Sequence, residues 1–314
     1  MVDVLTLGEV LASLRAHGPV RTAGRLGLSV AGAEANVCIG LARLGHLARF
    51  VGVVGGDQLG ALAVRTLRAE GVDISALRRS GSATGIVLFE RRLPGVSRVD
   101  YHRTSSAGTE LAAADVDRAW DPAPRILHVT GITTALGDGC REAVRHAVAT
   151  ARTAGTTVCL DINDRRRLWP ADQARAVLQP LVDEVDILVG SEEEIALVAA
   201  DPAAPVDGQA RELLARGVTE VVVKQGADGA TLHRSDGTTA QPAHPVEAVD
   251  PVGAGDAFVA GYLSATLDGL APAARLARGV AVGAFAVAGV GDWEGLPTRD
   301  ELDLLASPDG SVIR

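Results

Sequence analysis

Cysteine, lysine and aromatic residues are all scarce in this chain of 314 residues. The three cysteines, Cys38, Cys140 and Cys159, are too few and too widely spaced for a disulfide framework or a zinc cluster. We therefore expect reduced, buried thiols in a cytoplasmic protein. Aromatic residues make up 3% of the chain, which predicts a core filled mainly by Ala, Val and Leu. Lys224 is the only lysine among 30 basic residues.

Long apolar runs and excess positive charge are also missing. The longest apolar stretch, 279–291, has 13 residues, whereas a membrane-spanning helix needs roughly 18 or more. Residues 1–30 carry Asp3, Glu9 and Arg15 without a clean apolar segment, so no signal peptide is expected. The formal net charge of −9 argues against a broad surface for nucleic acid. Composition thus predicts a soluble protein with neither a membrane nor a nucleic-acid partner.

Strand and helix patterns alternate along most of the chain. A helix is expected from Ala33 to Gly45 and another at 58–70, which Asp57 is well placed to cap. Residues 84–103 interrupt the alternation as a hairpin with a turn at Pro94–Gly95. Because parallel strands need helical crossovers, the pattern predicts an α/β fold with an open, mostly parallel sheet covered by helices on both faces. We expect one domain over 1–314, with segments 9–30 and 84–103 forming a small β lid.

The segment 249–258, VDPVGAGDAF, is the most informative stretch of the chain. Gly253 and Gly255 allow a tight turn and close approach to a ligand, and the free N–H groups of the following helix favour an anion. Asp256 places a carboxylate in the same turn, either as a helix cap or as a base that faces a substrate hydroxyl. Together with the glycines, the base is the better interpretation, and the combination suits phosphoryl transfer.

Other nucleotide-binding signatures are missing. The chain has neither a G-x-x-x-x-G-K-[ST] loop nor the protein-kinase motifs. The Gly-Gly-Asp at 55–57 follows a strand but lacks G-x-G-x-x-G, so an NAD-dependent dehydrogenase is a remote alternative.

The chain resembles the ribokinase-like, or PfkB-type, carbohydrate kinases over nearly its whole length. DPVGAGDAFVAGYL (250–263) is similar to their C-terminal signature. AGAEANVCIGLARLG (31–45) and FVGVVGGDQLG (50–60) are similar to their sugar-binding signature, with Ala31 in place of its first glycine. The resemblance implies a ribokinase-like fold, ATP and Mg²⁺, and also allows a monovalent cation such as K⁺. It makes Asp256 the catalytic base and the amides of Gly253, Ala254 and Gly255 the anion hole.

Within the family, the chain most resembles kinases of 2-keto-3-deoxygluconate. The similar segments are Tyr101-His-Arg103, Gly131-Ile132-Thr133 and Asp161-Ile-Asn163-Asp-Arg165 followed by Leu168-Trp169. The resemblance implies a substrate site made of Gly32, Ala33, Asn36, Phe89, Tyr101, Arg103, Ile132, Arg165 and Asp292, with Phe89 where a tyrosine is common. A guanidinium matches a substrate carboxylate well. From spacing alone, however, Arg103 belongs to a solvated strand face with Arg91, Arg92 and Arg98.

The nucleotide side rests on two further segments. Ser191-Glu-Glu-Glu194 resembles the family's N-x-x-E, in which Glu194 organises Mg²⁺ through water; three acids at a helix start also stabilise its dipole without metal. Lys224-Gln-Gly226-Ala-Asp-Gly229 resembles the loop beside the nucleotide, although a lysine at a strand end is usually solvated. We also place Asn163 on the nucleotide side.

The sequence therefore predicts an ATP-dependent kinase for the terminal (C6) hydroxyl of 2-keto-3-deoxygluconate, which assembles as a homo-oligomer through its lid. The alternatives are a fructokinase, a ribokinase or a 5-keto-2-deoxygluconate kinase of the same family. A non-catalytic sugar or nucleotide sensor is a more remote alternative, because binding alone does not require Asp256 in line with the phosphates.

Overall fold

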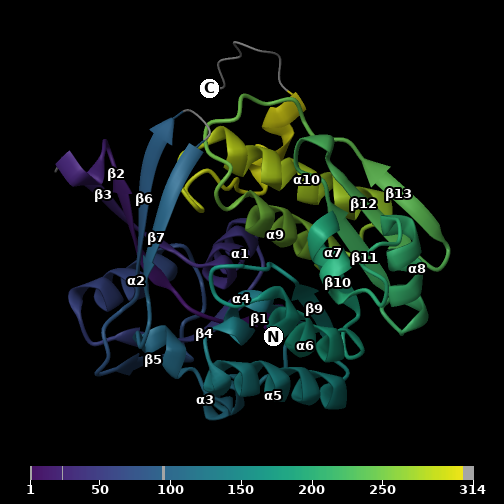
Figure 1. Cartoon of the computed structure of the whole chain (residues 1–314), viewed down its shortest axis with the longest axis horizontal. Helices are drawn as coiled ribbons and strands as arrows, with labels where there is room; N and C mark the ends of the chain where they lie inside the picture. Colours follow the sequence, from purple (N-terminus) through teal and green to yellow (C-terminus); the bar gives the residue numbers. More distant parts are fainter. Residues whose placement is uncertain (1, 23, 94–95, 307–314) are drawn as a thin grey trace.

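The computed structural model describes residues 2–22, 24–93 and 96–306, so the predicted Pro94–Gly95 turn lies outside the described residues. Figure 1 shows a helix-covered sheet beside a smaller sheet. The strands are β1 (Val4–Leu7), β2 (Leu11–Ala16), β3 (Leu26–Ala31), β4 (Ala48–Gly55), β5 (Leu77–Ser80), β6 (Ile86–Leu93), β7 (Val96–His102), β8 (Ile126–Thr130), β9 (Thr157–Asp161), β10 (Ile187–Ser191), β11 (Glu220–Lys224), β12 (Ala230–Arg234) and β13 (Gly237–Gln241). The α-helices are α1 (Ala33–Arg43), α2 (Gln58–Ala69), α3 (Ala113–Ala119), α4 (Gly131–Ala135), α5 (Asp138–Ala154), α6 (Ala171–Val182), α7 (Glu192–Val198), α8 (Val206–Ala215), α9 (Ala254–Leu267) and α10 (Pro272–Ala288).

The main sheet has the strand order β13-β12-β11-β10-β9-β8-β1-β4-β5. Strands β11 to β5 in this order pair in parallel, whereas β12 and β13 pair antiparallel at one edge. The predicted open, mostly parallel sheet is therefore confirmed. The sequence did not indicate β5 or β13, because their short sequences LRRS and GTTAQ lack an apolar alternation. Segment 131–133, one of the segments that resemble the family, begins the short helix α4.

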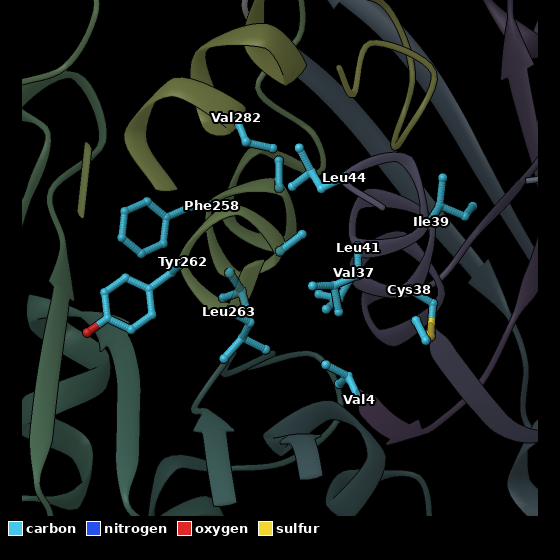
Figure 2. Packing of buried hydrophobic residues seen from close by; sticks show 14 of the residues in the cluster. Val4, Val37, Cys38, Ile39, Leu41, Leu44, Phe258, Tyr262, Leu263 and Val282 are labelled. Carbon is cyan, nitrogen blue, oxygen red and sulfur yellow. The ribbon is translucent and has the colours of Figure 1, made fainter. Parts of the chain in front are cut away.

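Helices cover both faces of this sheet because its strands alternate their side chains. In β1, Val4 packs into the layer with α1, α2, α9 and α10, while Leu5 and Leu7 pack into the layer with α3, α5 and α6. Figure 2 shows side chains of α9, among them Phe258 and Leu263, packed in the same layer as Val37 and Leu41 of α1. Within the described part of the chain, no helix combines the length and apolarity that crossing a bilayer requires.

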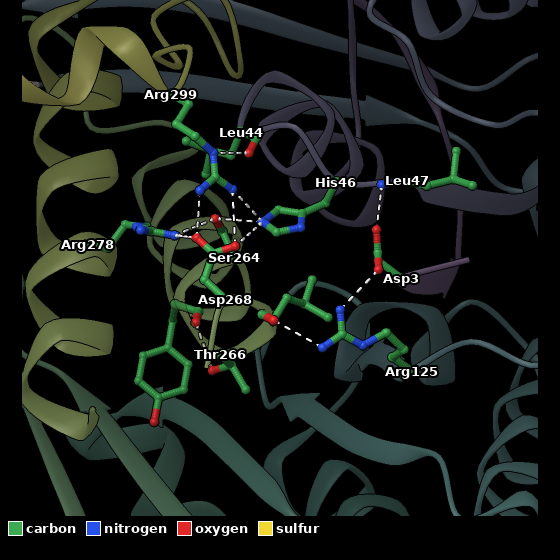
Figure 3. Close-up of polar contacts among 12 residues, drawn as sticks. Asp3, Leu44, His46, Leu47, Arg125, Ser264, Thr266, Asp268, Arg278 and Arg299 are labelled. Carbon is green, nitrogen blue, oxygen red and sulfur yellow. Dashed lines mark hydrogen bonds and ion pairs between the residues drawn. The ribbon is translucent and has the colours of Figure 1, made fainter. Parts of the chain in front are cut away.

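A polar cluster fixes the C-terminal end of α9 (Figure 3). Asp268 follows the helix and accepts hydrogen bonds from Arg278 of α10 and from Arg299. His46, in the α1–β4 connection, bonds to Ser264 of α9 at 2.9 Å. Burial raises the pKa of the Asp268 carboxyl, but the two arginines outweigh this effect and bring it to about 2. The cluster stays charged at neutral pH and anchors α9 at the end remote from Gly253.

Strands β3-β2-β6-β7 form the second sheet, which we call the lid. Its strands lie in the two segments expected to form a lid, except that β3 ends one residue beyond the first segment, at Ala31. Arg15 of β2 joins the lid to the main body, because its guanidinium lies 2.6 Å from Asp250 and 2.8 Å from Asp292. Trp293 also donates to the carbonyl oxygen of Val30 at 3.0 Å, and Arg167 donates to that of Val99. The lid is therefore held against the carboxyl ends of the main-sheet strands.

Candidate active site

Two cavities meet at the N-terminus of α9. The first, of about 340 Å³, lies between the lid and the main sheet, and the second, of about 570 Å³, lies between the β11–β12 loop and α10. Lys224, Pro251 and Gly255 line both. Ligands of open α/β sheets bind outside the carboxyl ends of the strands, and Lys224 ends β11 at that edge. The arrangement offers two adjoining binding sites with a helix N-terminus between them.

All nine residues expected around the substrate line the first cavity. They come from the lid, from α1 and α4, and from the loops that follow β9 and α10: Gly32, Ala33, Asn36, Phe89, Tyr101, Arg103, Ile132, Arg165 and Asp292. Sequence segments up to 260 positions apart are thereby brought together, since Gly32 and Asp292 share one cavity wall.

The turn into α9 depends on glycine. Gly253 caps the helix with a φ of +78°, and a Cβ atom there would lie 2.0 Å from the carbonyl oxygen of Asp292. The Ala254 amide donates to the carbonyl oxygen of Pro251 at 3.3 Å. The amides of Gly255 and Asp256, as the second and third residues of α9, have no acceptor within the helix. The amides of Gly253, Gly255 and Asp256 are therefore available to an anion at the junction of the cavities, whereas the predicted Ala254 amide is already bonded.

Asp256 is buried and held by two amide side chains. Asn36 of α1 donates to one carboxylate oxygen at 2.8 Å, and Asn163, after β9, donates to the other at 3.3 Å. Among the described hydrogen bonds, neither oxygen accepts a helix N–H, so the capping interpretation is wrong. Asn163, which we expected on the nucleotide side, lines the first cavity beside this carboxylate. The carboxylate is thus oriented in the wall of the first cavity, where a hydroxyl could reach it.

Lys224 forms an ion pair with Asp161 at 2.8 Å. Burial lowers the pKa of the Lys224 ammonium, but the carboxylates of Asp161 and Glu194 outweigh it and raise the pKa above its usual value. Burial also raises the pKa of the Asp161 carboxyl against the opposing effect of Lys224. The interpretation of Lys224 as a solvated strand-end residue is wrong, since its ammonium stands charged between the two cavities.

The two candidate partners of a substrate carboxylate differ in their surroundings. Arg103 is buried, donates to Glu9 and lies 4.1 Å above the ring of Tyr101. Its assignment to a solvated strand face is therefore wrong. Arg165 is exposed, and its described side-chain contact is a 3.3 Å hydrogen bond to the carbonyl oxygen of Asp164. Within the described residues it has no ion pair, so its charge is free for a ligand.

Phe89 and Asp292 both contact Arg15. The Arg15 guanidinium lies 4.4 Å from the centre of the Phe89 ring and pairs with the Asp292 carboxylate. Burial raises the pKa of Asp292 to about 6 although Arg15 opposes this effect. Asp292 therefore links the lid to the cavity wall as well as lining it.

The other residues expected around the nucleotide lie in two places. Gly226, Gly229 and Ala254 line the second cavity, whose remaining wall is largely apolar, as an aromatic base requires. Ser191 lines neither cavity; its hydroxyl caps α7, and Glu194 closes the capping box by accepting from the Ser191 amide at 2.8 Å.

Glu194 is the residue expected to hold Mg²⁺ through water. Its carboxylate also accepts the Asp164 amide at 2.8 Å, and burial raises its pKa against the effect of Lys224. No group of three or more His, Cys, Asp or Glu side chains suited to a metal ion occurs in the part of the chain that the structure describes. Mg²⁺ commonly takes one or two carboxylates plus substrate phosphates and water. A single carboxylate at the cavity edge fits that mode and does not fit an all-protein metal site.

Sequence reasoning missed several residues of the site. Glu9 lines the first cavity, and Arg15 holds the lid. The only available signal for Glu9 was a charged residue two positions after a short apolar strand. The segment 243–248 forms a wall of the second cavity and carries no motif.

Comparison with known proteins agrees with this geometry. Residues 2–299 match the model of the pfkB family carbohydrate kinases. The 2-dehydro-3-deoxygluconokinase of Bacillus subtilis is 35% identical over 99% of this chain and 97% of its own length, and that of Thermoproteus tenax is 37% identical over 97% and 94%. A solved structure of a candidate ribokinase II from E. coli, in complex with ATP and Mg²⁺, is 27% identical, covers 98% and 99% of the two chains and has a TM-score of 0.91. The chain belongs to the pfkB family of carbohydrate kinases.

Proposed function

We propose that this protein transfers the γ-phosphoryl group of ATP to the terminal (C6) hydroxyl of 2-keto-3-deoxygluconate. The observation that carries the proposal is the position of Asp256, buried beside the junction of two cavities and oriented by two asparagines. The relatives named 2-dehydro-3-deoxygluconokinase align over nearly the whole chain, which supports the choice of substrate.

In the proposed reaction, Asp256 accepts the proton of the acceptor hydroxyl. The hydroxyl oxygen forms the new bond to the γ-phosphorus while the bond to the ADP oxygen breaks. Gly253, Gly255 and Asp256 present their amides to the charge that develops on the moving group, and Lys224 adds a positive charge at the same junction. Positioning and charge stabilisation of this kind account for most catalysis of phosphoryl transfer.

The second cavity is the proposed ATP site. Gly226 and Gly229 bring backbone close to the phosphates, and the apolar wall receives the base. Glu194 would hold Mg²⁺ through water, and the bound ion supplies charge neutralisation at the phosphates. A K⁺ requirement stays a prediction. A cytoplasmic location also stays a prediction, which the three buried free cysteines support.

The charged residues of the first cavity favour an acidic sugar. Asp292 is paired with Arg15, Glu9 with Arg103, and Asp161 with Lys224. Arg165 is left as a cation without a described ion pair, and a sugar acid brings the carboxylate that it lacks. A neutral sugar would leave that guanidinium solvated by water alone.

An ADP-release assay of wild type and Arg165→Ala on 2-keto-3-deoxygluconate and on fructose tests the assignment. Arg165 is exposed, so its pair with the substrate is partly screened. We expect kcat/KM for the sugar acid to fall by about tenfold to a hundredfold, with kcat/KM for fructose nearly unchanged. Arg166→Ala, which removes a neighbouring arginine paired with Asp164, is the matched control. Equal proportional losses on both substrates would favour a neutral-sugar kinase.

We also propose that the protein assembles as a homo-oligomer through its lid. Leu26 and Leu28 are two positions apart in β3, so their side chains lie on the same face of the sheet. They are 48% and 55% exposed. Leu93 and Val96, at the ends of β6 and β7, are also exposed. Apolar side chains gathered on a small sheet are typical of a surface that another subunit covers.

A further inference from the structure

Glu9 is a buried acid at the edge of the first cavity that the proposed reaction does not use. It lies between β1 and β2, where the chain passes from the main sheet into the lid. Its side chain is 2% exposed, and one carboxylate oxygen has no hydrogen-bond partner among the described residues. A buried carboxylate with an unsatisfied oxygen is costly, so its presence here calls for a compensating role.

Glycine at two positions leaves room for this residue. A Cβ atom at Gly32 would lie 2.4 Å from the Glu9 carbonyl oxygen, and one at Gly108 would lie 2.9 Å from the Glu9 Cβ atom. Gly32 has a φ of +151°, which L-residues rarely adopt. Glu9 is therefore held between α1 and the segment that follows β7.

The partner of Glu9 is Arg103, where the chain leaves the lid. Arg103 follows β7, lines the first cavity and is itself only 8% exposed. One terminal nitrogen donates to Glu9, and the face of the guanidinium covers the Tyr101 ring. These two contacts fix both the position and the plane of the group.

A guanidinium has five N–H donors in one plane. The bond to Glu9 uses a donor on one edge of the guanidinium. Among the described hydrogen bonds, the other donors of Arg103 have no partner. We infer that Glu9 is a positioning residue, which fixes the Arg103 guanidinium against Tyr101 so that its free edge meets the carboxylate of the sugar substrate. This inference rests on the proposed sugar-acid function. Glu9 acts only through Arg103 and touches no reacting atom.

Removal of Glu9 tests the inference. Glu9→Ala is expected to raise KM for 2-keto-3-deoxygluconate by about tenfold to a hundredfold, because a misplaced binding group loses most of its effect. We expect kcat and KM for ATP to stay within about threefold. Glu9→Gln keeps a carbonyl acceptor for Arg103 and is expected to recover part of the loss. KM for fructose should change little in either variant, and this insensitivity separates a positioning role from damage to the fold.

A double-mutant cycle with Arg103→Ala shows whether Glu9 acts through Arg103. We expect Glu9→Ala to add less than about threefold to the KM of Arg103→Ala, since coupled residues are not additive. Effects that multiply, or equal changes in KM for the acid and for fructose, would overturn the inference. If Glu9→Ala does not fold, the Glu9→Gln and Arg103→Ala pair gives the same cycle. If wild type instead prefers fructose, the proposed function fails, and this outcome is distinct from a failure of the cycle.

Discussion

Replacing Glu34 by glutamine should change how the stability of the protein depends on pH. Glu34 lies in the first turn of α1, two residues before Asn36, and is fully buried. The hydroxyls of Thr130 and Thr133 both donate to one of its carboxylate oxygens, whereas the other has no partner among the described residues. Burial raises the pKa of this carboxyl from 4.5 to about 7, against the opposing effect of the two hydroxyls.

The size of the effect follows from the two pKa values. The folded protein holds this proton more tightly than the unfolded chain, so the contribution to stability is complete below pH 4.5 and is lost as the pH rises through 7. One pKa unit corresponds to about 1.4 kcal/mol. Between pH 5 and pH 8, wild type should therefore lose roughly 2–3 kcal/mol relative to Glu34→Gln, which cannot ionise.

Urea unfolding of both proteins at pH 5, 6, 7 and 8 measures this difference. Taking the difference at each pH cancels the groups that titrate identically in the two proteins. Glu142→Gln, a change at an exposed glutamate of α5, is the matched control and should give a constant difference. If the wild-type and Glu34→Gln stabilities ran parallel within about 0.5 kcal/mol across this range, Glu34 would have an ordinary pKa and the reasoning from burial would fail.

Two further predictions concern catalysis and assembly. Asp256→Asn removes the proton acceptor; its amide oxygen keeps one asparagine donor, while the other asparagine must turn its amide to accept from the new NH2 group. We expect kcat to fall by about 10²- to 10⁴-fold with ATP affinity, measured by calorimetry, almost unchanged. Turnover within threefold of wild type would contradict its role as base. Leu28→Asp places a charge on the exposed face of β3 and should convert the oligomer to monomers in sedimentation experiments. Leu47→Asp, at another exposed leucine, should leave the oligomer intact. A wild-type protein that is already monomeric would exclude assembly through the lid.

The pattern of the sequence was sufficient for the main sheet apart from its two edge strands, β5 and β13. Apolar strands separated by helical crossovers predict parallel pairing, and Gly253 to Asp256 predict an anion site because their chemistry is local. The partners of the charged residues could not be predicted in this way. Arg15 meets Asp250 and Asp292 across more than 230 positions, and Arg103 meets Glu9 across 94.

Such pairs depend on how the lid folds back onto the main sheet. The local pattern of apolar residues does not predict this. For the same reason, the spacing of Arg103 with other arginines indicated a solvated face, although packing against Tyr101 and Glu9 buries it. Asn163 was placed with the nucleotide, yet its side chain turns to Asp256.

The single lysine has a practical consequence for chemical labelling. In a chain that otherwise uses arginine for its basic residues, amine-directed reagents can react with only one side chain. That side chain is Lys224, paired with Asp161 between the two cavities. Because its ion pair keeps this amine protonated, it should react slowly with acylating reagents, and an isotopic methyl group placed on it would report on the reaction centre with only the α-amino group as a second signal. The same scarcity makes crosslinkers that join lysines unsuitable for studying its subunit contacts.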